Sequence, residues 1–99
     1  MAVLAVHQVP SLTRERYEEV VSRLTEGKSR FESMNEVPFE GLLVHVAAET
    51  EDGFLIVDVF DSQESFEKFG EEIAPIPREV GIEEPPKAYP AHTFVADLD

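Results

Sequence analysis

The sequence predicts a single α+β domain whose elements run in the order β-α-β-β-α-β. Three observations lead to this order: four short β-prone runs, two segments with apolar residues at helical spacing, and a hairpin signal between the second and third runs. A length of 99 residues allows one domain with one modest core, spanning residues 1–99. We therefore expect a ferredoxin-like fold, with a four-stranded antiparallel sheet and two helices on one face.

The first half of the chain supplies one strand and one helix. Residues 2–9 form a short β-prone run, and Ser11 or Thr13 can cap the helix that follows. The apolar residues of this helix recur at helical spacing: Tyr17, Val20, Val21 and Leu24. Gly27 is a candidate for its C′ position. Residues 28–38 are mixed and polar, and they predict either a helical extension or an ordered loop.

The second half supplies a hairpin, a helix and a last strand. Strands are expected over residues 42–48 and 54–60, joined by a turn in which Gly53 can take positive φ. The second helix begins with a capping-box pattern formed by Asp61 and Glu64. Its buried apolar stripe consists of Phe66, Phe69 and Ile73, and it stops at Pro75 and Pro77. Residues 81–90 cross back, and the last strand is expected over residues 91–95.

The composition excludes several classes of partner and site. Asp and Glu number 21 against 8 Lys and Arg, a net charge of −13 that repels nucleic acid and anionic membrane surfaces. The chain has no cysteine, so disulfides, thiolate catalysis and cysteine metal sites are excluded. The first ten residues do not resemble a signal peptide, and no apolar run approaches the ~20 residues of a membrane span. We therefore expect a cytoplasmic protein.

The expected third strand has apolar side chains on both of its faces. Leu55, Val57 and Val59 share one face, and the other face carries Phe54, Ile56, Asp58 and Phe60. We expect the aliphatic set to pack under the two helices, which leaves the face of Asp58 uncovered. Two helices can cover only one face of such a sheet, so the simplest cover for the second face is another copy of the chain. The sequence therefore predicts a homodimer.

Further motifs extend over almost the whole chain. They comprise Gly41-Leu-Leu-Val-His45-Val-Ala-Ala, the hairpin to Gly53, the run Val57-Asp-Val-Phe-Asp-Ser62 before a Phe-rich helix, and Tyr89-Pro-Ala-His92. These motifs resemble the antibiotic-biosynthesis-monooxygenase-like (ABM) proteins of the dimeric α/β-barrel superfamily, including small bacterial members. The resemblance implies a dimer with two sheets face to face and a cavity for a small molecule.

The resemblance also bears on activity and cofactors. Some members of the family oxygenate polycyclic aromatic substrates without metal or flavin, others degrade haem, and others have no assigned activity. This chain has no Trp, and Phe60 occupies the strand end where members often have one. Gly70 lies near the position of the axial His in the haem-degrading branch. We therefore expect no cofactor.

Asp58 and His45 are the candidate catalytic residues. An unpaired carboxylate in an apolar strand is costly, so Asp58 is either a general base or substrate anchor, or a structural acceptor of hydrogen bonds. If the hairpin places residues 45 and 58 opposite each other, the two form a dyad that can move a proton. A glycine bulge in the turn would shift the register by one residue and separate them.

Four further residues are candidates for contact with a substrate: Phe60, Phe54, His92 and Tyr17. Tyr17 belongs to the apolar stripe of the first helix, with its hydroxyl at the rim. His7 and His92 lie on the expected outer strands, but no pair of histidines has the local spacing of metal ligands, and we expect no metal.

Three classes of function follow from these residues. The first is a cofactor-independent monooxygenase or related enzyme that acts on a hydrophobic, ionisable small molecule. The dyad would deprotonate a phenol or enol, and the electron-rich anion could then react with oxygen. The second is a non-catalytic dimer that binds a small hydrophobic ligand, and the third is an accessory role beside an enzyme.

Overall fold

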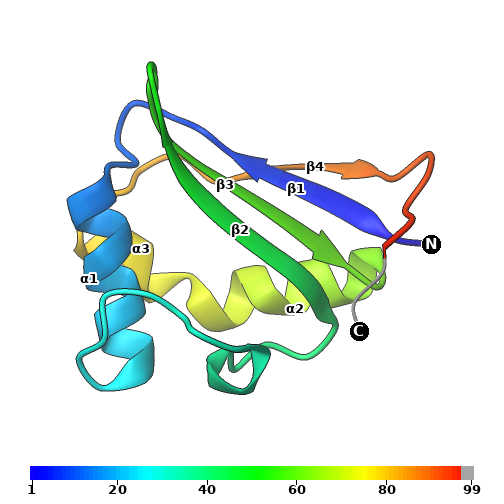
Figure 1. Ribbon diagram of the computed structural model, residues 1–99, viewed down its shortest axis with the longest axis horizontal. Coiled ribbons are helices and arrows are strands. Elements are labelled where there is room, and N and C mark those ends of the chain that lie inside the picture. Colours follow the sequence, from blue (N-terminus) through cyan, green and yellow to red (C-terminus); the bar gives the residue numbers. More distant parts are fainter. Residues whose placement is uncertain (97–99) are drawn as a thin grey trace.

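The chain forms a four-stranded antiparallel sheet with its helices on one face, which confirms the predicted ferredoxin-like fold. A computed structural model describes residues 1–96, and Figure 1 shows the sheet lying over the helices. The elements are β1 (Val3–His7), α1 (Arg14–Thr25), the 3-10 turn η1 (Met34–Glu36), β2 (Leu42–Thr50), β3 (Gly53–Phe60), α2 (Gln63–Ile73), α3 (Pro75–Glu79) and β4 (Lys87–Pro90). The strand order is β2-β3-β1-β4, and every neighbouring pair is antiparallel.

Side-chain caps begin both long helices. The Thr13 hydroxyl accepts from the Arg16 amide at 3.2 Å at the start of α1, as expected. In α2 the cap is Ser62, whose hydroxyl accepts from the Ser65 amide at 3.1 Å. The prediction of Asp61 as this cap was therefore wrong by one residue. The Asp61 carboxylate instead accepts from the Ser65 hydroxyl at 2.5 Å.

Of two predicted boundaries in the second half of the chain, one was confirmed and one was wrong. α2 ends at Ile73, before Pro75, as predicted, and Pro75 begins the short helix α3, because the first turn of a helix needs no amide donor. The last strand lies at residues 87–90, not 91–95. β4 pairs with β1 from Val6 back to Val3, and the Ala91 amide still reaches the Ala2 carbonyl at 2.8 Å. β4 thus ends opposite Val3, the first residue of β1.

The register of the β2–β3 hairpin places His45 directly opposite Asp58. Thr50 pairs with Gly53 across a two-residue turn, and Gly53 takes a φ of 129° there. The irregularity in the ladder lies at the other end, between Leu42 and Val44. This bulge inserts Leu43, so that Leu42 can face the helices on the same side as His45.

The face assignment of β3 was wrong, because Asp58 lies beneath the helices and not on the uncovered side. Phe54 packs on Tyr17 of α1 with ring centroids 4.9 Å apart. Phe60 is fully buried and contacts Phe66 and Phe69 of α2 at 5.5 and 5.2 Å. The large rings bury the most apolar area, so the chain places them in its own helix–sheet core and leaves the smaller aliphatic set outside.

The outer face of the sheet is apolar except for Lys87 on β4, and no helix or strand among residues 1–96 covers it (Figure 1). Residues 91–94 border it at Leu4 and Val59. The register aligns Val57 at its centre with Val6 on one side and Val46 on the other, and Val46 remains 51% exposed. The same face carries Leu4, Val44, Leu55, Val59 and Tyr89. Contiguous apolar patches of this kind mark interaction sites. Among residues 1–96, no helix has the length and apolar character to cross a bilayer.

We predict that this outer face is the contact surface of a homodimer. Val57→Lys places a charge at its centre and should convert a dimer at micromolar concentration into a monomer, measured by light scattering. Gln63→Lys, on the exposed start of α2, makes the same change in net charge away from the face and should leave the dimer intact. A folded wild-type monomer with no tendency to associate would contradict the prediction.

Candidate functional site

A cavity of about 100 Å³ lies between the helix-facing side of the sheet and α1. Its walls are almost entirely apolar, with side chains such as Val20, Val21 and Leu24 contributed by α1. Four residues with polar groups also line it: His7, Tyr17, His45 and Asp58. The cavity therefore combines an apolar interior with a small set of polar groups, which is the usual character of a small-molecule site.

Three of these residues form a continuous chain of hydrogen bonds. The Tyr17 hydroxyl lies 2.7 Å from Nε2 of His45, and Nδ1 of His45 lies 2.6 Å from a carboxylate oxygen of Asp58. An ionised carboxylate can only accept, so Nδ1 carries the proton that it donates to Asp58. Nε2 of the neutral ring then accepts from the Tyr17 hydroxyl. We call this arrangement the relay.

Each member of the relay is positioned by a different element. Asp58 lies on the inward face of β3, His45 faces it from β2, and Tyr17 reaches His45 from α1. Two aromatic contacts hold the imidazole ring: Tyr17 stacks on it with centroids 5.9 Å apart, and Phe31 meets it edge-on at 5.5 Å. Of the two registers that the sequence left open, the structure has the one that places residues 45 and 58 opposite each other. The donor from α1 is an addition that the sequence did not predict.

Burial shapes the acidity of the tyrosine. Removal from water raises the pKa of Tyr17 to about 12, and the nearby charge of Asp58 contributes in the same direction. Tyr17 is therefore protonated at neutral pH and can donate to His45. In the relay it is therefore a hydroxyl donor and not a phenolate.

His7 is a cavity residue that the search for candidate substrate contacts missed. Its Nε2 lies 2.7 Å from the carbonyl oxygen of Glu84. A carbonyl can only accept, so the neutral ring donates from Nε2 and has a lone pair on Nδ1. Strand parity could have found it: His7 shares a face with Ala5, which pairs with Asp58 across the β1–β3 ladder.

Three of the candidate substrate contacts do not reach the cavity. Phe54 and Phe60 belong to the core on the helix side of the sheet, where Phe54 supports the ring of Tyr17. His92 lies with Tyr89 and Phe94 in a separate hollow that also contains Leu4 and Val59 of the outer face. Of the four candidates, only Tyr17 lines the cavity with His45 and Asp58.

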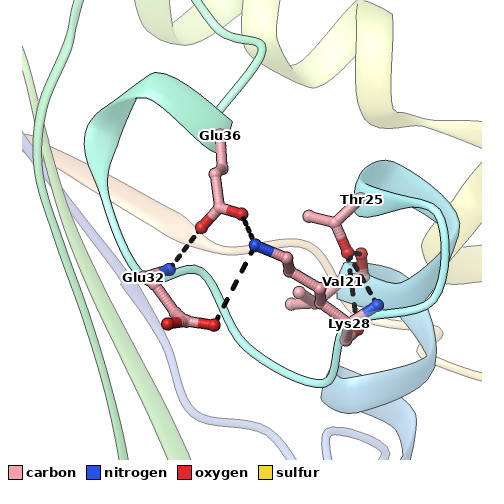
Figure 2. Close-up of polar contacts among 5 residues, drawn as sticks. All are labelled: Val21, Thr25, Lys28, Glu32 and Glu36. Atoms are coloured by element: carbon pink, nitrogen blue, oxygen red, sulfur yellow. Dashed lines mark hydrogen bonds and ion pairs between the residues drawn. The ribbon is translucent and has the colours of Figure 1, made fainter.

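Residues 26–40, here called the covering segment, close one side of the cavity. They are an ordered loop with one 3-10 turn, and Phe31, Val37 and Phe39 from this segment line the cavity. Figure 2 shows a polar clamp that holds the loop. In it the Glu36 carboxylate pairs with the Lys28 ammonium and accepts from the Glu32 amide at 2.7 Å. The clamp sets the position of Phe31 between its two ends.

The base of the same loop is tied to α1. The Thr25 hydroxyl donates to the Val21 carbonyl at 2.7 Å and accepts from the Lys28 amide at 3.1 Å (Figure 2). Hydrogen bonding to Glu36 raises the pKa of Lys28, and hydrogen bonding to Lys28 lowers the pKa of Glu36. Because the pKa of Glu36 is lowered and that of Lys28 is raised, both groups stay charged at every pH between these two pKa values.

We predict that Tyr17 titrates far above an ordinary tyrosine. The chain has two tyrosines, so a Tyr89→Phe variant reports Tyr17 alone. Its tyrosinate absorbance should rise with a midpoint near pH 12. Because the folded pKa is raised, the stability that Tyr17 contributes is complete below the ordinary tyrosine range and is lost as pH rises through 12. Adding Asp58→Asn should lower the midpoint only in part, since burial is the larger cause, whereas an ordinary tyrosine midpoint would contradict the assignment.

We predict that the clamp opens in acid. The lowered pKa of Glu36 means that its contribution is present above the ordinary glutamate range and is lost as pH falls through the lowered value. Hydrogen exchange of the Glu32 amide, corrected for its intrinsic rate, should therefore be protected near neutral pH and exposed in acid. In Glu36→Gln the protection should no longer depend on pH across the acid range. Equal protection in acid and at neutral pH in the wild type would show that the clamp does not hold the segment.

Comparisons with known proteins assign no family to this chain. No protein-family model matches it, and no curated protein matches it. Among solved structures, it is similar to a monooxygenase from the gene ActVA-Orf6 of Streptomyces coelicolor, crystallised in complex with the ligand nanaomycin D. The TM-score is 0.45 and the sequence identity 16%, with 97% of this chain and 91% of that chain covered. A similarity of this extent carries no argument about function, which must come from the relay itself.

Proposed function

We propose that this protein removes a proton from a small, weakly acidic and largely apolar molecule, and that it does so as a cofactor-independent monooxygenase or related enzyme. The observation that carries the proposal is the continuous hydrogen-bonded path from Tyr17 through His45 to Asp58 in an apolar cavity. A histidine oriented by a carboxylate and bonded to a hydroxyl is the arrangement that general-base catalysis requires.

Proton transfer proceeds through two hydrogen bonds in this proposal. The bound phenol or enol gives its proton to the Tyr17 oxygen while Tyr17 gives its own proton to Nε2 of His45. The resulting imidazolium lies beside the Asp58 carboxylate, which stabilises the new positive charge. The products of this step are a substrate anion and a protonated relay, so the total charge is unchanged.

The apolar walls favour the next step. An anion in a cavity with few polar groups is poorly solvated and correspondingly electron-rich. Dioxygen is small and apolar, so it can share such a cavity, and it is the oxidant that the proposal names. For a phenol, a C–O bond forms between a ring carbon of the anion and dioxygen, and the O–O bond then breaks. One oxygen atom stays as a quinone carbonyl and the other leaves as water, with the substrate supplying all four electrons. The protein contributes deprotonation, orientation and exclusion of water.

A second function is favoured by one specific observation. The cavity of about 100 Å³ is smaller than the ~300–1,000 Å³ of typical ligand sites, which suits the retention of a small apolar ligand without reaction. In that case the relay would be a structural network that satisfies Asp58. The two functions make different predictions for the ionisation of a bound phenol.

We predict that the protein ionises para-nitrophenol when it binds it. The colour of the bound probe reports its phenolate form, so the apparent pKa of the bound probe should be lower than that of the free probe. Tyr17→Phe and Asp58→Asn should each abolish the shift because they break the relay at opposite ends. Tyr89→Phe, on the other face of the sheet, is the matched control and should behave like the wild type.

The same variants test turnover. Oxygen uptake with an electron-rich phenol should fall by ~10²–10⁴-fold in Asp58→Asn, the usual contribution of a general acid–base group. A purely structural relay gives the opposite pattern: a lower melting temperature in Asp58→Asn, with probe binding intact and no ionisation even in the wild type. That pattern would reject catalysis and leave the binding function.

A further inference from the structure

A second hollow of about 400 Å³ adjoins the relay cavity. The two have six lining residues in common: His7, Phe69, Ile73, Pro77, Ile82 and Pro86. One wall of this outer pocket is the face of α2 around Phe66 and Gly70, and the other is the segment Glu83–Pro86. The shared residues form the partition between the inner cavity and the outer pocket, and side chains of the partition face both.

The outer wall is tied to the start of the chain by three hydrogen bonds. His7 donates to the Glu84 carbonyl at 2.7 Å, and the Ser11 hydroxyl accepts from the Glu83 amide at 2.9 Å. The Ser11 hydroxyl also donates to the Glu84 carboxylate. These bonds link residues more than seventy positions apart, so the wall is built by the fold and the pocket is present before any ligand binds.

Size decides what the two chambers can hold. The inner cavity alone lies below the range of ligand sites, while the outer pocket lies within it. The outer pocket is lined by apolar side chains that it shares with the cavity, such as Phe69 and Ile73. It is also lined by charged residues that the cavity lacks, Arg78 and Glu83, here called its rim. A ligand that fills both chambers therefore has a compact acidic group in the inner cavity, beside the relay, and an apolar chain that extends into the outer pocket.

We propose that the cavity and the outer pocket form one binding site for a phenol or enol that carries a linear apolar tail. The acidic head lies at Tyr17, and the tail passes the partition at His7 and runs along α2 toward the rim. The position of the head rests on the proposed function. The position of the tail rests on the adjoining walls alone, so the two can be tested separately.

Gly70 offers a direct test of the tail. It is exposed on α2 and lines the outer pocket but not the inner cavity. A Cβ added there meets no atom within 4 Å, so a side chain at residue 70 begins in open space. Gly70→Phe should occupy the outer pocket and leave the relay untouched. Gly70→Ala is the matched control, because it changes the helix in the same place but fills almost no space.

The experiment measures Kd by calorimetry for para-alkylphenols from para-methylphenol to para-octylphenol. In the wild type and in Gly70→Ala, affinity should rise about fourfold per methylene until the outer pocket is full. In Gly70→Phe the rise should stop within the first few carbons, while the Kd of para-methylphenol stays unchanged. The proposal is overturned if affinity rises with alkyl length as much in Gly70→Phe as in the wild type, or if it does not rise in the wild type.

Different variants test the position of the phenol head and the position of the alkyl tail. Tyr17→Phe should weaken every member of the series by the same factor and leave the gain per methylene intact. If Tyr17→Phe has no effect while Gly70→Phe still truncates the gain, the proposed function fails and the outer subsite stands. A gain that Gly70→Phe does not change would place the tail elsewhere, such as beneath the covering segment or on the outer sheet face. A series in which no member binds rejects both proposals.

Discussion

The buried carboxylate of Asp58 is the constraint on which the rest of the site depends. Asp58 is 7% exposed in a strand whose neighbours are apolar, and an unpaired charge there would be strongly destabilising. Its donor, His45, is supplied by the hairpin register, and the donor to His45 is supplied by the placement of α1 over the sheet. Within residues 1–96, every buried side-chain nitrogen or oxygen has a hydrogen-bond partner. The hydrogen bonds that satisfy this one carboxylate therefore link β3, β2 and α1.

The apolar surroundings that make this coupling necessary also make it useful for chemistry. Hydrogen bonds in a low-dielectric interior are stronger and more directional than in water. The same burial holds Tyr17 in its protonated form, so its hydroxyl can donate to His45, as the proposed proton transfer requires. The covering segment completes the enclosure with Phe31, whose edge contacts the imidazole. One set of contacts thus satisfies the buried carboxylate and arranges the groups on which the proposed proton transfer depends.

Local sequence patterns predicted most of the elements. Apolar periodicity located α1 and α2, the glycine turn located the hairpin, and strand parity placed Phe54, Asp58 and Phe60 on one face. The pairing of His45 with Asp58 depended on the turn length, which the sequence narrowed to two alternatives. The prediction of the last strand was wrong because the position of β4 is set by its pairing with β1, and pairing with a distant segment cannot be seen in the local sequence pattern.

What the sequence determined by itself was the order of the elements and which residues share a face, because both follow from the period of a helix or a strand. What only the tertiary structure decided was which face lies under the helices. The alternation of side chains along β3 is the same whichever face the helices cover. Which face they cover depends on the aromatic contacts of Phe54 with α1 and of Phe60 with α2. The third member of the relay, Tyr17, and the outer pocket beyond His7 also come from this choice. They join residues that are far apart in the chain, and no local period relates such residues.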